Sequence, residues 1–344
     1  MEFKRELSLF DVTNIVVGAV VGADIYIASA ITAGLLGPFS LVVWIIAGIF
    51  ATVIALVFAY CSYYVPKVGG PFAFVSEAFD DFFGFLTGWS MWVAEVISLP
   101  VFAIAFVRYL EYLVPLSFPG EILVKGVFVF GLTTINIIGV KMAGRVNDVL
   151  TFIKLLPLLL LIGAGLAFLA REPSVFIANY QPFAPLGVSA TGTALVLIFW
   201  AYVGFELGTL PAAEVKDPRT TIPKAIITGM AIVALFYLAT NFIVYGTVNW
   251  TTLSQSSTPL ILVGSVVLGT FGALIMTVGA LFSVSGSDET GMLGTGRLSY
   301  AMAIDGLFPH HFRSCTRDTA HPGSPLPCRA SSLLASRSTH RSPA

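Results

Sequence analysis

The segment Gly18-Ala19-Val20-Val21-Gly22-Ala23-Asp24 interrupts a long apolar stretch near the start of the chain. A second segment of the same kind, residues 200–208, reads Trp-Ala-Tyr-Val-Gly-Phe-Glu-Leu-Gly. Each combines glycines with one carboxylate, Asp24 in the first and Glu206 in the second. Paired interrupted apolar segments in corresponding halves of a chain are typical of the binding site of a secondary transporter. The sequence therefore predicts two discontinuous membrane helices that share a site.

The composition predicts a polytopic membrane protein. The 344 residues are 56% hydrophobic and 11% charged, with a mean hydropathy of +0.89, whereas soluble domains contain about 25% charged residues. The net charge of −1 provides no basic field for nucleic acid. The sequence contains no metal spacing, phosphate loop or Ser-His-Asp pattern. We therefore expect neither an enzyme nor a cofactor or metal site.

Eight stretches approach the length of about 20 apolar residues that a membrane helix needs. They are residues 12–36, 39–63, 83–113, 122–140, 146–170, 191–213, 222–248 and 271–293. Residues 258–269 form a further apolar stretch that is too short to span, so we expect a surface or re-entrant helix there. Residues 1–9 carry no cleavage-site pattern, and the first helix is expected to insert uncleaved.

Lysine and arginine are unevenly divided between the two sides that these spans create. The richer side carries Lys4, Arg5, Lys67, Lys141, Arg145, Lys216, Arg219, Lys224 and Arg297. The other side carries Arg108, Lys125 and Arg171. Cytoplasmic loops are enriched in these residues. We therefore expect a multi-pass protein of the cell membrane with its N-terminus in the cytoplasm.

The glycines of the first segment allow two interpretations. Gly18 and Gly22 have the four-residue spacing that lets membrane helices pack closely. Asp24 favours a functional site instead, because an aspartate at the membrane centre costs about 2.5–3.5 kcal/mol on insertion scales. The freed amides of Gly22, Ala23 and Asp24 would then lie at the end of a half-helix, where they suit a substrate's polar head group.

The second segment repeats this pattern with aromatic residues added. Gly204 and Gly208 flank Glu206, and Trp200 and Tyr202 precede them. A large aromatic ring beside a broken helix can cover an organic cation through a cation–π contact. Packing against lipid or the protein core is the alternative, and it applies more strongly to Tyr202 than to Trp200.

Five motifs occur along the chain in the order found in one transporter family. They are GAVVGADIY at 18–26, PKVGGP at 66–71 with Gly88-Trp89, FWAYVGFE at 199–206, EVKDPRTTIPKA at 214–225 and RLSYAMAIDGLFP at 297–309. Together they resemble the permeases of the amino acid–polyamine–organocation (APC) superfamily over about residues 7–312. The resemblance implies an all-α LeuT-like fold, in which five helices are repeated with inverted topology and the first and sixth are discontinuous.

By this resemblance, residues 1–312 form the permease domain. A first repeat covers about residues 10–170, and a partial second repeat covers about residues 190–312. Helices nine and ten would be missing, so the permease would be truncated at its C-terminal end.

From residue 313 onward the Lys and Arg residues are all Arg, and Ser, Pro and Thr are frequent. Residues 313–344 are therefore expected to be a disordered tail or the product of a frameshift.

The resemblance also implies a function and roles for the two segments. The function is secondary active transport of amino acids or related amines across the cytoplasmic membrane, by alternating access around the two broken helices and coupled to protons as a symport. Backbone groups around Gly18, Gly22, Ala23 and Asp24 would meet the substrate carboxylate. Carbonyls near Trp200, Tyr202 and Gly204 would meet its ammonium, and Glu206 would be a gating residue. A ligand-binding sensor and a non-functional permease remnant remain alternatives, and the oligomeric state is not predicted.

Asp24 departs from the family pattern, which has glycine at this position. Two ionised carboxylates would repel each other in the site. Three explanations remain open: Asp24 is protonated, its side chain turns away, or the substrate is an amine without a carboxylate.

Other ionisable residues also fall within the predicted spans. Lys154 resembles a fifth-helix lysine that replaces a sodium ion in proton-coupled members of the family, and the alternative is a lysine that snorkels to the interface. Glu95 is expected to face another helix, either for a structural hydrogen bond or for transport. Asp288 and Glu289 follow Ser283, Ser285 and Ser287 and are expected to face water at the membrane edge.

Overall fold

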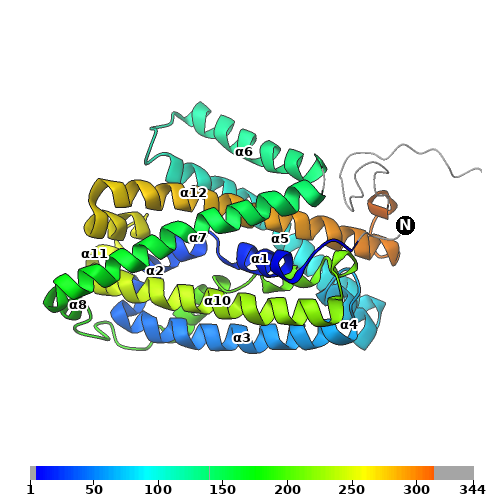
Figure 1. Ribbon diagram of the computed structural model, residues 1–344, viewed down its shortest axis with the longest axis horizontal. Helices are drawn as coiled ribbons and strands as arrows, with labels where there is room; N and C mark the ends of the chain where they lie inside the picture. Colours follow the sequence, from blue (N-terminus) through cyan, green and yellow to red (C-terminus); the bar gives the residue numbers. More distant parts are fainter. Residues whose placement is uncertain (1–4, 139, 314–344) are drawn as a thin grey trace, which may run out of the picture.

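The computed structural model describes residues 5–138 and 140–313. Of the predicted tail, residues 313–344, all but the first residue lie outside the described part of the chain. The described residues form helices that run mostly along the long axis of the molecule (Figure 1). An isolated parallel bridge between Leu7 and Val215 is the one β-type pairing among them. The prediction of an all-helical polytopic membrane protein is confirmed.

The elements follow one another in a simple order. They are α1 (Leu9–Val20), α2 (Asp24–Leu36), η1 (Gly37–Phe39), α3 (Ser40–Tyr64), α4 (Pro71–Ala78), α5 (Asp81–Leu110), α6 (Phe118–Ile138), α7 (Val140–Arg171), α8 (Pro173–Asn179), α9 (Thr191–Trp200), η2 (Phe205–Thr209), η3 (Ala212–Glu214), α10 (Pro218–Thr247), α11 (Trp250–Ser254), α12 (Pro259–Ile304) and η4 (His310–Arg313).

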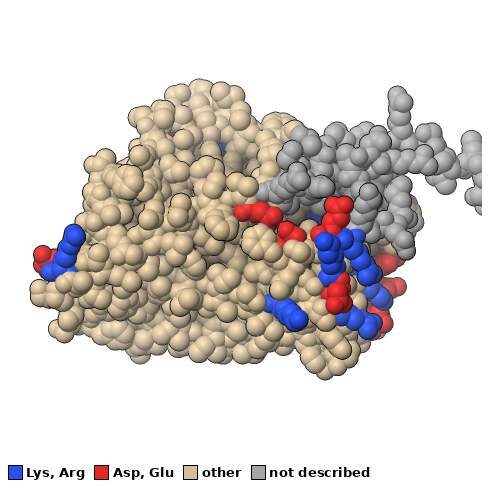
Figure 2. Space-filling model, viewed as in Figure 1, with Lys and Arg blue, Asp and Glu red and all other residues tan. Residues whose placement is uncertain are grey.

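Seven helical segments within the described residues are long and apolar enough to cross a membrane. The first of them, Leu9–Tyr64, is 56 residues long and folds back at η1. It therefore contains two of the eight predicted spans, and the other six each fall on one segment. Figure 2 shows that the charged side chains on this face form a small group at the left end and a larger group in the right-hand part, with uncharged surface over most of the remaining face. This is the distribution that a membrane-spanning body requires.

The first helix begins at a capping box. The Ser8 hydroxyl accepts a hydrogen bond from the amide of Asp11 at 3.4 Å, and the Asp11 carboxylate accepts one from the amide of Ser8 at 2.6 Å. These bonds satisfy two backbone donors that the first helical turn leaves without partners. The cap fixes where α1 starts, and therefore how far its other end reaches into the protein.

The short apolar stretch 258–269 is a helix that folds against the span that follows it. The backbone of α12 leaves the helical conformation at Gly269, where φ is 64° and ψ is −150°. Across this kink the backbones of Gly264 and Gly272 touch, and a Cβ atom on Gly264 would lie 2.8 Å from the carbonyl oxygen of Gly272. Side chains larger than hydrogen would push the two segments apart.

Substitution of Gly272 by alanine is expected to destabilise the protein. Its methyl group would overlap the carbonyl of Gly264, and overpacking of this kind costs about 1–3 kcal/mol. Gly163 of α7 is the matched control, because no atom lies within 4 Å of a Cβ there. Thermal unfolding in detergent should show a lower Tm for Gly272→Ala and an equal or higher Tm for Gly163→Ala. Equal Tm values for the two variants would contradict the proposed contact.

Candidate functional site

Both predicted interruptions are present. The first helix ends at Val20 and α2 begins at Asp24, with an extended backbone at Val21 (φ −77°, ψ 91°). The helix of the second segment, α9, ends at Trp200. The 3₁₀ segments η2 and η3 follow it in place of a continuous α-helix. Gly204 lies in this second break with φ 126°, a conformation that disfavours residues with a Cβ atom.

The two breaks are in direct contact. A Cβ atom on Gly204 would lie 2.9 Å from the carbonyl carbon of Ala19 and 3.0 Å from the amide nitrogen of Val20. One turn further on, a Cβ atom on Gly208 would lie 2.6 Å from a methyl group of Val16. Glycine is therefore needed at both positions for backbone to approach α1 this closely. The structure thus brings together the end of α1 and the second segment, which are about 180 residues apart in the sequence.

The Asp24 side chain lies at the first break. Asp24 is the first residue of α2 and is 6% exposed. The Tyr237 hydroxyl lies 3.4 Å from its carboxylate and 2.8 Å from the carbonyl oxygen of Val20, to which it donates. The backbone amides of Gly22 and of Asp24 itself also interact with this carboxylate. The Asp24 carboxylate therefore interacts with backbone amides that have no helical partner because of the break.

Lys154 of α7 points at the same break from another side. Its side chain is fully buried, so it does not snorkel to the interface. The ammonium donates a hydrogen bond to the carbonyl oxygen of Gly18, near the end of α1. It also interacts electrostatically with Asp24 and with Glu289 of α12. A buried amino group thus lies between α1, α7 and α12.

Two hydroxyl groups of α12 complete this environment. Ser283 donates to the carbonyls of Val21 and Gly22, both at 3.1 Å. Ser287 reaches the carbonyls of Gly18 and Val21, both at 3.2 Å. Ser285 points elsewhere and bonds within its own helix. Because a helix end leaves its last carbonyls without internal partners, these serines and Lys154 satisfy the carbonyls that end α1.

The expectation that Asp288 and Glu289 face water is wrong. Both residues are fully buried, and none of their carboxylate oxygens has a hydrogen-bond partner within the described part of the chain. The close packing of α12 against α5 and α7 covers them, whereas the sequence suggested a helix end. Glu95 of α5 faces this region as expected, since a Cβ on Gly291 would lie 2.8 Å from its carboxylate.

The Glu206 side chain bonds to the backbone of the break in which it lies. Its carboxylate accepts a hydrogen bond from the amide of Gly204 at 3.0 Å, and its carbonyl accepts one from the Thr209 hydroxyl at 2.6 Å. The side chain therefore stabilises the irregular backbone between α9 and η2. It also lies within electrostatic range of Glu95.

The two aromatic residues of the second segment have different surroundings. Tyr202 is fully buried, and its ring packs against those of Trp44 and Tyr237 at centroid distances of 6.0 and 5.1 Å. Trp200 is 49% exposed and shares the outward face of α9 with Val196, which is 72% exposed. Tyr202 thus joins the core beside the first break through Tyr237, whereas the Trp200 ring lies on the surface.

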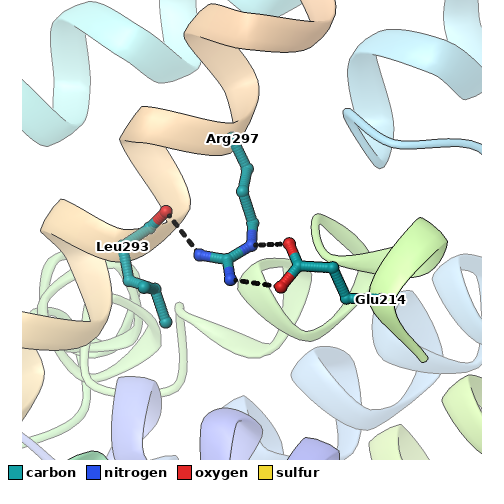
Figure 3. Close-up of polar contacts among 3 residues, drawn as sticks. All are labelled: Glu214, Leu293 and Arg297. Atoms are coloured by element: carbon teal, nitrogen blue, oxygen red, sulfur yellow. Dashed lines mark hydrogen bonds and ion pairs between the residues drawn. The ribbon is translucent and has the colours of Figure 1, made fainter. Parts of the chain in front are cut away.

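An ion pair holds the far end of the second segment. Arg297 of α12 forms a buried two-pronged ion pair with Glu214 of η3, with N···O distances of 2.7 and 2.9 Å, and also donates to the carbonyl of Leu293 at 3.1 Å (Figure 3). The adjacent backbone pairs with the chain before α1, because the amide of Leu7 donates to the carbonyl of Glu214 at 2.9 Å. The ends of both broken helices and α12 are therefore joined at one place.

Sequence reasoning did not identify several groups of this site. One is Tyr237, and the others are Asn147 and Thr151, whose side-chain oxygens would lie 2.7 and 2.8 Å from a Cβ atom on Gly18. All three lie in apolar spans and have no local pattern that marks them. Ser283 and Ser287 were noted in the sequence, and their shared position at the break could have been expected, because residues four apart lie on one face of a helix. Thr290, one turn further on, bonds to the Asn147 side chain at 2.8 Å.

Two discontinuous helices that meet inside an apolar helical body are typical of membrane transport proteins. Comparison with known families agrees, since the profile described as "Amino acid permease" matches residues 7–328. The chain belongs to this amino acid permease family. Membership of a permease family identifies a transport protein rather than an enzyme.

Individual relatives are similar over most of the chain. A branched-chain amino acid permease, BcaP of Bacillus subtilis, is 26% identical over 89% of this chain and 68% of its own length. An uncharacterized protein of Methanocaldococcus jannaschii is 30% identical over 91% of this chain and 72% of its own length. A methylthioribose transporter of B. subtilis is 27% identical over 94% of this chain and 72% of its own length.

Removing one partner of the Glu214–Arg297 pair should be strongly destabilising. Arg297→Leu leaves a buried carboxylate without its cation, which costs about 3–5 kcal/mol of unfolding free energy. The double variant Glu214→Leu/Arg297→Leu should be less destabilised than the sum of the two single variants, since neither charge is then left alone. Stability would be measured by unfolding in detergent.

The exposed pair of Lys67 and Glu77 provides the control for this double-mutant cycle. Both side chains are more than half exposed, so Lys67→Leu should change the free energy of unfolding by less than about 1 kcal/mol. Additive effects of Glu214→Leu and Arg297→Leu would contradict a coupled pair.

Proposed function

We propose that this protein is a proton-coupled secondary transporter of amino acids or related amines, working by alternating access around the breaks between α1 and α2 and between α9 and η2. The single observation that carries the proposal is the contact of the two breaks inside the membrane body. Irregular backbone at membrane depth is tolerated only where it is buried in protein or lines a cavity. Such breaks provide amides and carbonyls that a polar substrate can bind.

In this proposal the substrate binds to the backbone of the two breaks. Gly18, Gly22, Ala23 and Asp24 contribute from the first helix, and the carbonyls near Trp200, Tyr202 and Gly204 contribute from the second. The buried position of Tyr202 supports a role in shaping the site, whereas the exposed ring of Trp200 leaves only its backbone near the break. The permease relatives support a small substrate of the amino acid class.

Glu206 is proposed as a gating residue. Its carboxylate bonds to the amide of Gly204, which holds the second break in one conformation. Release of this bond would let the segment change its conformation during alternating access. The cytoplasmic N-terminus and the location in the cell membrane remain part of the proposal, and they rest on the uneven distribution of Lys and Arg.

Lys154 is proposed as the proton-coupling residue. Its ammonium bonds to the carbonyl of Gly18 and interacts with Asp24 and Glu289. When it is protonated, the lysine joins α7 to the end of α1, and loss of the proton would weaken this connection. The protonation state of one side chain would thereby be coupled to the position of the first broken helix.

The Lys154→Ala variant is expected to lose proton-driven accumulation of substrate. Uptake of labelled amino acids into proteoliposomes would be measured with and without an inward proton gradient. Exchange of labelled for unlabelled substrate at equal pH on both sides should persist, because it requires a folded site but no net proton movement. Lys125→Ala is the control, since Lys125 pairs with Glu121 on α6 and lies outside the site. Unchanged gradient-driven uptake in Lys154→Ala would refute the role.

Asp24 is expected to determine whether substrates with a carboxylate bind well. Its side chain interacts with the amides of Gly22 and Asp24, which a substrate carboxylate would otherwise contact. Asp24→Gly should strengthen the binding of amino acids and weaken that of polyamines, by about tenfold for each interaction gained or lost. Ligand-dependent shifts of Tm in detergent would measure both classes. Equal shifts in the wild type and the variant would contradict this role.

A further inference from the structure

A groove at one end of the molecule lies outside the transport site. It runs between the last turns of α3 and the first turns of α10 and has a volume of about 400 Å³. Figure 1 shows these two helices side by side, and the groove is at the end where α3 terminates and α10 begins. Its walls include Leu56, Tyr60, Tyr63, Arg219, Lys224 and Ile227.

The groove contains two cations and no acidic residue in its lining. Arg219 and Lys224 are both exposed, and neither forms an ion pair within the described residues. The nearest carboxylate in the sequence, Asp217, accepts a hydrogen bond from the Thr220 hydroxyl at 2.7 Å. The two positive charges are therefore available for an anion that enters the groove.

The polarity of the groove changes along its length. α3 runs toward this end of the molecule and α10 runs away from it (Figure 1). Tyr63 and Arg219 therefore lie at the outer part of the groove, near the end of the molecule. Leu56 and Ile227 lie at its inner part, nearer the middle of the molecule. Eight residues of helix separate Arg219 from Ile227, which corresponds to about 12 Å. Lys224 starts deeper but has a chain long enough to bring its ammonium outward. The groove thus has a cationic outer end and an apolar inner end.

We propose that this groove binds an anionic phospholipid of the surrounding membrane. The phosphate of the head group would lie against Arg219 and Lys224, with the tyrosine hydroxyls nearby, and an acyl chain would follow Leu56 and Ile227 inward. Basic grooves between membrane helices near the head-group level have this chemistry. A soluble anion would use only the outer half of the groove and would leave its apolar inner part uncovered.

Native mass spectrometry of the purified protein can test the proposal. The protein would be incubated with equal amounts of dioleoyl phosphatidylglycerol and dioleoyl phosphatidylcholine. The wild type should retain the phosphatidylglycerol preferentially. The variant Arg219→Gln/Lys224→Gln should bind it about 25-fold more weakly, and each single variant about fivefold more weakly. Both side chains are exposed, so Tm should be unchanged.

Lys67→Gln is the matched control, because this exposed lysine is paired with Glu77 and does not line the groove. Its lipid retention should equal that of the wild type. Equal retention of the two lipids by the wild type would overturn the proposal, and so would a loss in Lys67→Gln as large as in the double variant. Inorganic phosphate that displaces the lipid at millimolar concentration would also overturn it, since it would indicate a simple anion site.

Discussion

The structure depends on one constraint, which is that a broken helix inside a membrane must have its free backbone groups satisfied by other parts of the protein. The break after Val20 leaves the carbonyls of Gly18, Val21 and Gly22 without partners in α1. Lys154 from α7 and two serines from α12 bind these carbonyls. Tyr237 from α10 binds the carbonyl of Val20. The helices around α1 are therefore arranged about its break, and each contributes a polar group to it.

Glycine makes the second half of this arrangement possible. Gly204 allows the backbone of the second break to touch the backbone of α1, so the two irregular segments share one buried region rather than two. The far end of the second segment is joined to α12 by the Glu214–Arg297 pair (Figure 3). α12 thus contacts the first broken helix at its break and the second near its end. A movement of one broken helix would therefore be transmitted to the other through α12.

Much of the fold could be predicted from the sequence, because the membrane limits the choice. A lipid environment requires long apolar helices, and each of the eight predicted spans falls on a helical segment. Glycines beside a carboxylate within such a span predicted both breaks correctly. Which polar groups surround the breaks could not be predicted, since Tyr237, Asn147 and Thr151 belong to helices far away in the sequence and their side chains meet α1 only after packing.

The sequence by itself therefore determined the helices, the two breaks and the family, since these follow from local composition and from short motifs. The tertiary structure alone decided which side chains face the breaks. It buried Asp288 and Glu289, which sequence reasoning placed in water, and it left the Trp200 ring on the surface. The physical reason is that burial depends on which helix covers a residue, and this is a property of the packed bundle and not of any one segment.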